Sequence, residues 1–154
     1  MEAKIILNNE EDTKKLAKKF AKSKFKNMIV CLDGDLGSGK TFFSKSFAKE
    51  IGINEAVTSP TFTIIKEYEG KTPFYHIDVY RLNGDVEGIG LEEYFDKGGI
   101  VFIEWSSMIK NFLPKERIEI DIKRISETKR ELTITSYGDK YDRLLGEVLW
   151  IYYF

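Results

Sequence analysis

The chain has 154 residues, enough to bury the core of one domain, and its charged side chains nearly cancel to a net charge of −1. This balance excludes a general electrostatic attraction to nucleic acid or to an anionic membrane. Cys31 is the only cysteine, which excludes an intrachain disulfide, and no apolar run approaches the ~20 residues of a membrane span. The N-terminus lacks the apolar stretch of a secretory signal, so we expect a single cytoplasmic α/β domain over residues 1–154.

The N-terminal segment is predicted to form a short strand over residues 4–7 and a helix over residues 10–23. Asn8 or Asn9 can cap this helix, and acidic residues fill its first turn. Its apolar stripe consists of Leu16, Ala17, Phe20 and Ala21. The opposite side carries Lys14, Lys15, Lys18, Lys19 and Lys22. We interpret this side as a solvated lysine face, and the alternative is a face that contacts RNA.

A phosphate-binding motif, Gly34-x-x-x-x-Gly39-Lys40-Thr41, follows an apolar run over residues 28–32 and precedes helix-forming residues from 40 to 51. Strand, glycine-rich loop and helix form the context that such a loop requires. Glycines let main-chain N–H groups surround an anion, and the positive end of the helix points at the phosphates. Lys40 would reach the β- and γ-phosphates, and the Thr41 hydroxyl would bind Mg²⁺. A chance match is expected in roughly one chain in a hundred or fewer.

A hydroxyl-rich segment over residues 57–63, which includes Pro60, follows this helix, and Gly52 is expected to end the helix. In many NTPases a segment at this place senses the γ-phosphate and its metal. The alternative is an ordinary Ser-Pro turn. Local chemistry does not decide between the two.

Two β-rich runs, residues 62–68 and 74–80, are predicted to form a hairpin. Alternation places His76, Asp78 and Tyr80 on one face of the second run. We interpret His76, the only histidine, as a structural residue with satisfied hydrogen bonds. Asp78 is less easily explained as a purely structural residue, because an acid in an aromatic strand needs a cation or hydrogen-bond donors nearby.

A short helix over residues 91–95, ended by Gly98 and Gly99, precedes the apolar run 100–103, and Glu104 follows that run at once. A phosphate-loop enzyme needs an acid at the end of a buried strand opposite the loop, where it holds Mg²⁺ directly or through water. We favour this metal role for Glu104 over a carboxylate that simply emerges into solvent.

The C-terminal part is predicted to contain a second hairpin, residues 117–125 and 130–137, and a last helix over residues 141–150. The chain ends in Ile151, Tyr152, Tyr153 and Phe154. These aromatic side chains either cover the core, which we favour, or form a contact patch for a partner.

Several segments together resemble one family, the bacterial tRNA threonylcarbamoyladenosine biosynthesis ATPase TsaE, also called YjeE. The matching segments keep their order and spacing from about residue 8 to 137, and residues 139–154 lie outside the match. They are Gly34-Asp35-Leu36-Gly37-Ser38-Gly39-Lys40-Thr41, Ser59-Pro60-Thr61-Phe62-Thr63, His76-Ile77-Asp78-Val79-Tyr80-Arg81-Leu82, Glu93-Tyr94-Phe95, Glu104-Trp105 and Leu113-Pro114. This combination is far more specific than the phosphate loop alone.

The resemblance implies an α/β, P-loop NTPase-like three-layer fold with a central mixed β-sheet and antiparallel hairpins. It also implies a Mg²⁺-dependent ATPase, weak alone, whose partners are the TsaD and TsaB proteins. Together these proteins move a threonylcarbamoyl group onto the adenosine next to the anticodon of ANN-decoding tRNAs. The ATPase would meet tRNA indirectly, through the complex. ATP binding and hydrolysis would reset the complex between turnovers.

The same resemblance implies roles for individual residues. The expected Mg²⁺ ligands are Thr41 and Glu104, and the residues that wrap the phosphates are Gly37, Ser38, Gly39, Lys40, Thr41 and Phe42. Asp78 is similar to a second acid required for activity, which would position the attacking water. Lys40, Asp78 and Glu104 are therefore the expected catalytic residues.

Further residues match positions near the nucleotide in the family. Glu10 and Thr13 match an acidic residue and a threonine near the start of the first helix, which lie close to the nucleotide. Trp105 is named only because it follows the metal acid. Ser59 and Thr61 would belong to the switch-like loop. Family members often have Gly-Arg at the start of the last strand, and this chain has Lys129-Arg130, so Arg130 is a weaker candidate for a nucleotide contact.

Two other functions also fit a phosphate loop. A small-molecule kinase would need a lid with clustered arginines, whereas the arginines here are scattered and no lid-sized insertion is present. A nucleotide-dependent binding module would differ from the ATPase only in whether hydrolysis is required. We prefer the ATPase subunit.

Overall fold

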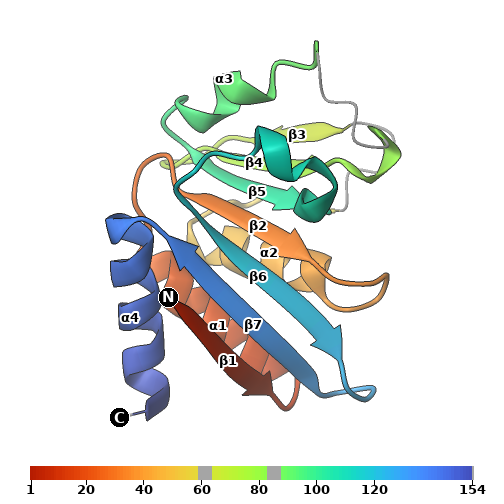
Figure 1. Cartoon of the computed structure of the whole chain (residues 1–154), viewed down its shortest axis with the longest axis vertical. Coiled ribbons are helices and arrows are strands. Elements are labelled where there is room, and N and C mark those ends of the chain that lie inside the picture. The colour runs from red at the N-terminus through yellow and green to blue at the C-terminus, as the bar shows by residue number, and fades with distance from the viewer. Residues whose placement is uncertain (59–63, 83–87, 154) are drawn as a thin grey trace.

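A mixed β-sheet forms the centre of the molecule (Figure 1). The computed structural model describes residues 1–58, 64–82 and 88–153, and within these ranges the sheet has seven strands in the order β1-β7-β6-β2-β5-β4-β3. Strands β6, β2, β5 and β4 are parallel, whereas β7 and β1 at one edge and β3 at the other pair antiparallel. The strands are β1 (Glu2–Leu7), β2 (Ile29–Asp33), β3 (Ile65–Tyr68), β4 (Phe74–Asp78), β5 (Ile100–Glu104), β6 (Arg117–Arg124) and β7 (Arg130–Tyr137).

Helices on both faces of the sheet complete three layers (Figure 1). One face is covered by α1 (Glu10–Lys22), α2 (Lys40–Glu50) and α4 (Asp139–Tyr153). The other face carries α3 (Leu91–Phe95) and the 3₁₀ segments η1 (Tyr80–Leu82) and η2 (Ser106–Phe112). The predicted three-layer α/β fold with a mixed sheet and antiparallel hairpins is therefore confirmed.

Each face of the sheet has its own apolar core, because side chains alternate along a strand. On β2, Val30 and Leu32 pack with the residues of α1 and α2, while Ile29 and Cys31 pack with those of α3 and η2. All four side chains are almost fully buried. Burial raises the pKa of the Cys31 thiol, so this cysteine is an inert core residue.

Aromatic packing fixes α2 against β5. The ring of Phe102 lies 4.6 Å from that of Phe47 and 6.0 Å from that of Phe43, measured between centroids. All three side chains are fully buried. Burying each contributes roughly 1.5–3 kcal/mol, so the position of α2 relative to β5 is strongly determined.

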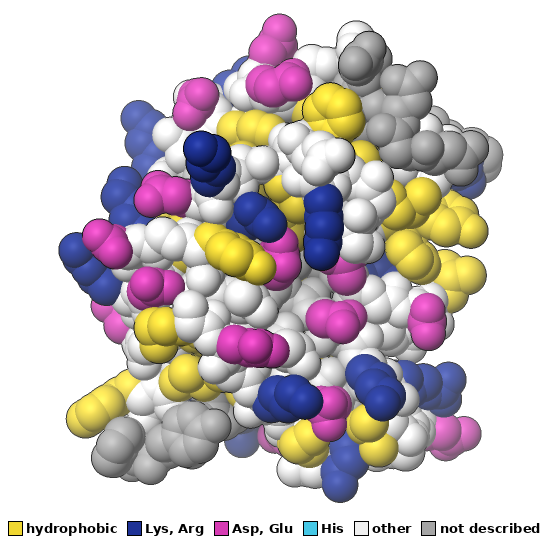
Figure 2. Space-filling model, in the orientation of Figure 1, with side chains coloured by type: hydrophobic (Ala, Val, Ile, Leu, Met, Phe, Trp, Pro, Cys, Tyr) yellow, Lys and Arg dark blue, Asp and Glu magenta, His cyan; other side chains and the backbone are white. Residues whose placement is uncertain are grey.

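The N-terminal helices begin and end where the sequence signals lie. The Asn9 side chain accepts a hydrogen bond from the Asp12 N–H at 2.9 Å and caps α1. Gly52 follows α2 with a φ of 88°, a conformation that favours glycine. The five lysines opposite the apolar stripe of α1 are exposed or half-buried, as predicted. On the face of the molecule drawn in Figure 2, Lys and Arg side chains are interspersed with Asp and Glu side chains.

The end of β4 differs from the prediction. The strand ends at Asp78 rather than at Tyr80, because the Asp78 carboxylate accepts a hydrogen bond from the Tyr80 N–H at 3.0 Å and the chain turns into η1. Tyr80 therefore does not continue the strand face of His76. Strand β3 is described from Ile65, and residues 62 and 63 of the predicted strand lie outside the described ranges.

Helix α4 is longer than predicted and covers the core. It begins at Asp139 and runs through Tyr153, and its buried side chains are Tyr141, Leu144, Leu145 and Val148. Trp150, near its end, is 62% exposed. None of the helices in the described ranges has the length and apolar character needed to cross a membrane.

Gly34→Ala is expected to destabilise the fold, whereas Gly146→Ala is expected to stabilise it slightly. A Cβ at Gly34 would collide with the Ile122 carbonyl oxygen and lie 2.7 Å from Ser38 Oγ, in a backbone with a φ of 145°. A Cβ at Gly146, in α4, would meet nothing within 4 Å. We expect a loss of about 1–3 kcal/mol at Gly34 and a gain of about 0.4–1 kcal/mol at Gly146 in the free energy of unfolding in urea. Equal effects would contradict this difference.

Candidate nucleotide-binding site

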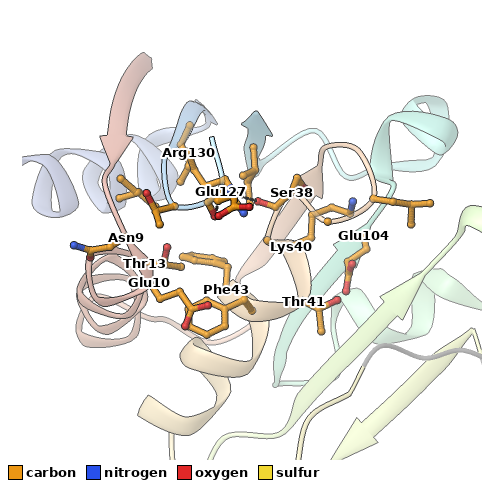
Figure 3. A pocket seen from close by; sticks show the side chains of 18 of the residues that line it. Asn9, Glu10, Thr13, Ser38, Lys40, Thr41, Phe43, Glu104, Glu127 and Arg130 are labelled. Atoms are coloured by element: carbon orange, nitrogen blue, oxygen red, sulfur yellow. Dashed lines mark hydrogen bonds between the residues drawn. The ribbon is translucent and has the colours of Figure 1, made fainter. Parts of the chain in front are cut away.

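The predicted site residues gather at the edge of the sheet where β2, β4 and β5 end, the usual ligand site of open α/β sheets. A cavity of about 370 Å³ opens there (Figure 3). Ser59 and Thr61, predicted for the switch-like loop, lie outside the described residues. The cavity lining contains every other predicted site residue: Glu10, Thr13, Gly37, Ser38, Gly39, Lys40, Thr41, Phe42, Asp78, Glu104, Trp105 and Arg130.

Three glycines shape the loop between β2 and α2. Gly34, Gly37 and Gly39 have φ values of 145°, 76° and 112°, in the region that disfavours a side chain. Gly39 is the N-cap residue of α2, and no acidic residue occupies the first turn of this helix. The first N–H groups of α2, which have no partner within the helix, are therefore free of competition from a neighbouring carboxylate of that turn, and the positive end of the helix can receive an anion.

The ammonium of Lys40 lies within the loop. It donates hydrogen bonds to the carbonyl oxygens of Gly34 and Asp35, the latter at 3.1 Å, and lies 4.2 Å from the centroid of the Trp105 ring. Burial lowers the pKa of Lys40, and nearby carboxylates, first that of Glu104, oppose the shift. The cation of the loop is thus held beside the predicted metal-binding acid.

Trp105 turns the chain sharply after β5. Its φ of 62° is uncommon for a residue other than glycine. Its N–H donates to the Leu32 carbonyl at 2.9 Å, and its ring lies 4.8 Å from the Tyr80 ring. This turn brings the indole from the end of β5 over Lys40, where the aromatic face favours the cation.

Glu104 and Thr41 approach each other from β5 and α2. Figure 3 shows the Thr41 hydroxyl and the Glu104 carboxylate pointing toward one another. Glu104 is only 2% exposed, and His76 Nε2 forms a hydrogen bond with its Oε2 atom. His76 is buried, but its Nδ1 has no hydrogen-bond partner among the described residues, so the expectation that all its hydrogen bonds are satisfied is wrong.

The donor set of this corner fits Mg²⁺. Hydroxyl and carboxylate oxygens are the ligands that this ion prefers, usually one or two from the protein and the remainder from phosphates and water. No group of three His, Cys, Asp or Glu side chains in the described ranges could hold a metal by itself. A Mg²⁺ ion at Thr41 and Glu104 would therefore take its remaining ligands from a bound phosphate and from water.

Asp78 lies directly opposite Glu104 in the register of β4 and β5. Burial raises the pKa of Asp78, and its hydrogen bond from the Tyr80 N–H opposes this shift. A half-buried carboxylate with a raised pKa at the rim of a phosphate site is a good acceptor for a proton or a hydrogen bond from water.

Arg130, at the start of β7, binds main-chain oxygens. Its Nε donates to the Ser38 carbonyl at 2.8 Å, and its Nη1 donates to the carbonyls of Ser126 at 2.7 Å and Lys129 at 3.0 Å. The guanidinium thus links the phosphate-binding loop to the turn between β6 and β7. These contacts indicate that Arg130 supports the loop, in addition to lining the cavity.

The first turn of α1 contributes Glu10 and Thr13 to the other side of the cavity. Figure 3 shows Glu10 and Thr13 on the side away from Thr41 and Glu104. Apolar side chains also contribute to the lining, namely Leu7, Phe43, Ile122 and Leu132. A polar helix end beside apolar walls can accommodate the base and sugar of a nucleotide.

The predicted site did not include Asp33 or the turn between β6 and β7, although the hairpin itself was predicted. The Asp33 carboxylate accepts hydrogen bonds from the Ser106 hydroxyl at 2.6 Å and the Ser107 N–H at 2.9 Å. It thereby joins the end of β2 to the segment after Trp105. Asp33 could have been recognised from its position directly before the glycine loop. Glu127 and Thr128 line the cavity but lie in a polar turn with no distinguishing pattern.

Arg130→Ala is expected to weaken nucleotide binding about tenfold, because the loop loses a charge-assisted hydrogen bond to the Ser38 carbonyl. Arg124→Ala is the matched control, since Arg124 lies in the same hairpin and its Nε donates to Ser126 of its own turn at 3.2 Å. Calorimetric titration of ADP into both variants measures the difference. An Arg130→Ala protein that binds ADP as tightly as the control would contradict the supporting role.

Comparisons with known proteins identify the family of the chain. The family model described as threonylcarbamoyl adenosine biosynthesis protein TsaE matches residues 7–132. The chain is 47% identical over 141 residues to the tRNA threonylcarbamoyladenosine biosynthesis protein TsaE of Bacillus subtilis strain 168, covering 91% of this chain and 89% of the relative. It is 43% identical over 142 residues to the TsaE protein of Rickettsia bellii, covering 88% and 96%.

A solved structure is similar over nearly the whole fold. The crystal structure of Bacillus subtilis YdiB matches with a TM-score of 0.82 and 43% sequence identity, covering 96% of this chain and 94% of that one. Its fold is P-loop NTPase-like, as is the one described here. The phosphate-binding loop, the family match and these relatives together show that the chain belongs to the TsaE family of tRNA threonylcarbamoyladenosine biosynthesis proteins.

Proposed function

We propose that residues 1–154 form a single Mg²⁺-dependent ATPase domain, slow alone, that resets a TsaD–TsaB complex between rounds of threonylcarbamoyl transfer to tRNA. The observation that carries the proposal is the convergence of Thr41 and Glu104 at the phosphate-binding loop, inside one cavity. The partner pair and the resetting role come from the family resemblance. The ATPase chemistry is supported by the loop, its lysine and the two acids.

In this proposal, different groups of the chain bind different parts of ATP. The N–H groups of residues 37–42 would bind the phosphates, and Lys40 would exchange its carbonyl acceptors for phosphate oxygens. Thr41 and Glu104 would hold Mg²⁺, which when bound neutralises charge on the phosphates. Asp78 would accept a hydrogen bond from the attacking water and hold it in line. Glu10 and Thr13 would face the nucleoside.

Glu104→Ala is expected to reduce ATP hydrolysis by on the order of 10²- to 10³-fold while ADP still binds in EDTA, because a metal ligand contributes several kcal/mol at the transition state. Glu92→Ala, an exposed acid on α3 that does not line the cavity, is the control. Phosphate release and calorimetry with and without Mg²⁺ provide the measurements. Full hydrolysis by Glu104→Ala would rule out the metal role.

Lys40→Ala is expected to weaken ATP binding by roughly 10- to 100-fold, because charged hydrogen bonds to phosphate are worth about 1.5–3 kcal/mol. Lys49→Ala removes an exposed lysine from the last turn of the same helix and should bind ATP normally. Unchanged calorimetric affinity of Lys40→Ala would count against the phosphate-binding loop itself.

The isolated chain is expected to hydrolyse ATP slowly, and TsaD with TsaB from the same organism to accelerate it. A pull-down with and without ATP, followed by a turnover assay on the recovered complex, measures both. A fast ATPase that ignores the partners would refute the proposed role. A complex that modifies tRNA repeatedly with Glu104→Ala would instead favour a binding module without essential turnover.

A further inference from the structure

A buried histidine lies behind the predicted metal-binding carboxylate. His76 of β4 has no exposed surface, and its Nε2 contacts Oε2 of Glu104 on the neighbouring strand β5. No other hydrogen bond to this carboxylate is found within the described ranges. A buried carboxylate needs donors to remain oriented and charged, so this single contact largely determines how Glu104 is presented.

The surroundings of Nδ1 indicate which nitrogen of the His76 ring carries the proton. His76 Nδ1 is buried and has no hydrogen-bond partner among the described residues, and the ring lies 5.9 Å from the Phe74 ring. A buried N–H without an acceptor is rarer and costlier than a buried acceptor without a donor. The ring therefore carries its proton on Nε2 and donates it to Glu104 Oε2, an assignment that follows from the hydrogen bonds.

This donation leaves the two carboxylate oxygens unequal. Oε2 is occupied by the ring, whereas Oε1 has no hydrogen bond within the described ranges. The carboxylate as a whole points toward the Thr41 hydroxyl (Figure 3). An outer partner of this kind fixes the direction of a metal ligand, and its loss typically lowers metal affinity by about 10- to 100-fold.

We propose that His76 is a positioning residue: its Nε2–H fixes Glu104 so that Oε1 faces Thr41 and is presented to the nucleotide-bound divalent cation. The inference rests on the proposed function, in which Thr41 and Glu104 hold that cation. His76 does not touch the substrate and acts only through Glu104. Its effect is therefore on metal affinity, and the affinity of the loop for the nucleotide alone is left unchanged.

Three substitutions of His76 distinguish a role as hydrogen-bond donor to Glu104 from a role in filling space in the core. His76→Gln keeps an N–H donor near the position of Nε2, His76→Asn carries a donor that is too short to reach, and His76→Phe keeps a ring without any donor. Mn²⁺ serves as the probe, and its affinity in the presence of excess ADP is measured by electron paramagnetic resonance. ADP affinity in EDTA and cooperative thermal unfolding are measured for every variant.

We expect the variants to differ in their affinity for Mn²⁺ and not in their affinity for ADP. His76→Asn and His76→Phe bind Mn²⁺ about 10- to 100-fold more weakly than the parent, His76→Gln recovers most of the loss, and ADP binding in EDTA is the same for all. Where His76→Phe does not fold, the Asn and Gln variants decide. Equal Mn²⁺ affinity of those two, or loss of cooperative unfolding in all three, overturns the inference. A parent protein that binds no Mn²⁺ with ADP overturns the proposed function itself.

Discussion

The contact between the rings of Phe43, Phe47 and Phe102 is the constraint on which the site depends. Phe102 precedes Glu104 by two residues on β5, and Phe43 follows Thr41 by two residues on α2. Because these rings are fully buried, the spacing of helix and strand is set by close packing of the core. The separation of the hydroxyl and the carboxylate is therefore a consequence of apolar packing behind them.

Polar contacts to main-chain groups then fix the segments around the loop. The Arg130 guanidinium holds the Ser38 carbonyl, and the Asp33 carboxylate holds the chain that leaves β5. Both contacts join residues more than 70 positions apart in the sequence. They constrain backbone that glycines would otherwise leave free, which reduces the entropy lost when a ligand binds.

Sequence patterns predicted the parts of the site that depend on local order. The glycine loop lies between a strand and a helix, and Glu104 follows a buried strand, so both could be recognised from neighbouring residues alone. The contact of His76 with Glu104 could not, because it requires β4 to lie beside β5, and chain order does not determine the order of strands in a sheet. The hydrogen bonds of Arg130 with main-chain carbonyls could not be recognised either, because they also depend on how distant segments pack, and its contact with a nucleotide stays a prediction from the family resemblance.

Competition between local and periodic signals explains the boundaries that were wrong. The alternation of side chains predicted a strand through Tyr80. The strand ends at Asp78 instead, because the Asp78 carboxylate accepts a hydrogen bond from the Tyr80 N–H. The left-handed turn at Trp105 and the 3₁₀ segment after it have no periodic pattern, so nothing in the sequence indicated that an indole would cover the lysine of the loop.

Among the described residues that line the cavity, Arg130 is the only arginine, which gives a physical reason for the slow turnover that we propose for the isolated chain. An arginine that reaches the transferring phosphate accelerates such reactions by about 10³- to 10⁵-fold. In the described structure the Arg130 guanidinium is already engaged with the carbonyls of Ser38, Ser126 and Lys129. Releasing it would break the four hydrogen bonds that the guanidinium donates to the carbonyls of Ser38, Ser126, Glu127 and Lys129, and would loosen the loop between β2 and α2. In the proposed mechanism, the loop amides, Lys40 and the metal would then stabilise the charge that develops on the phosphate, and a further cation supplied by a partner would accelerate hydrolysis.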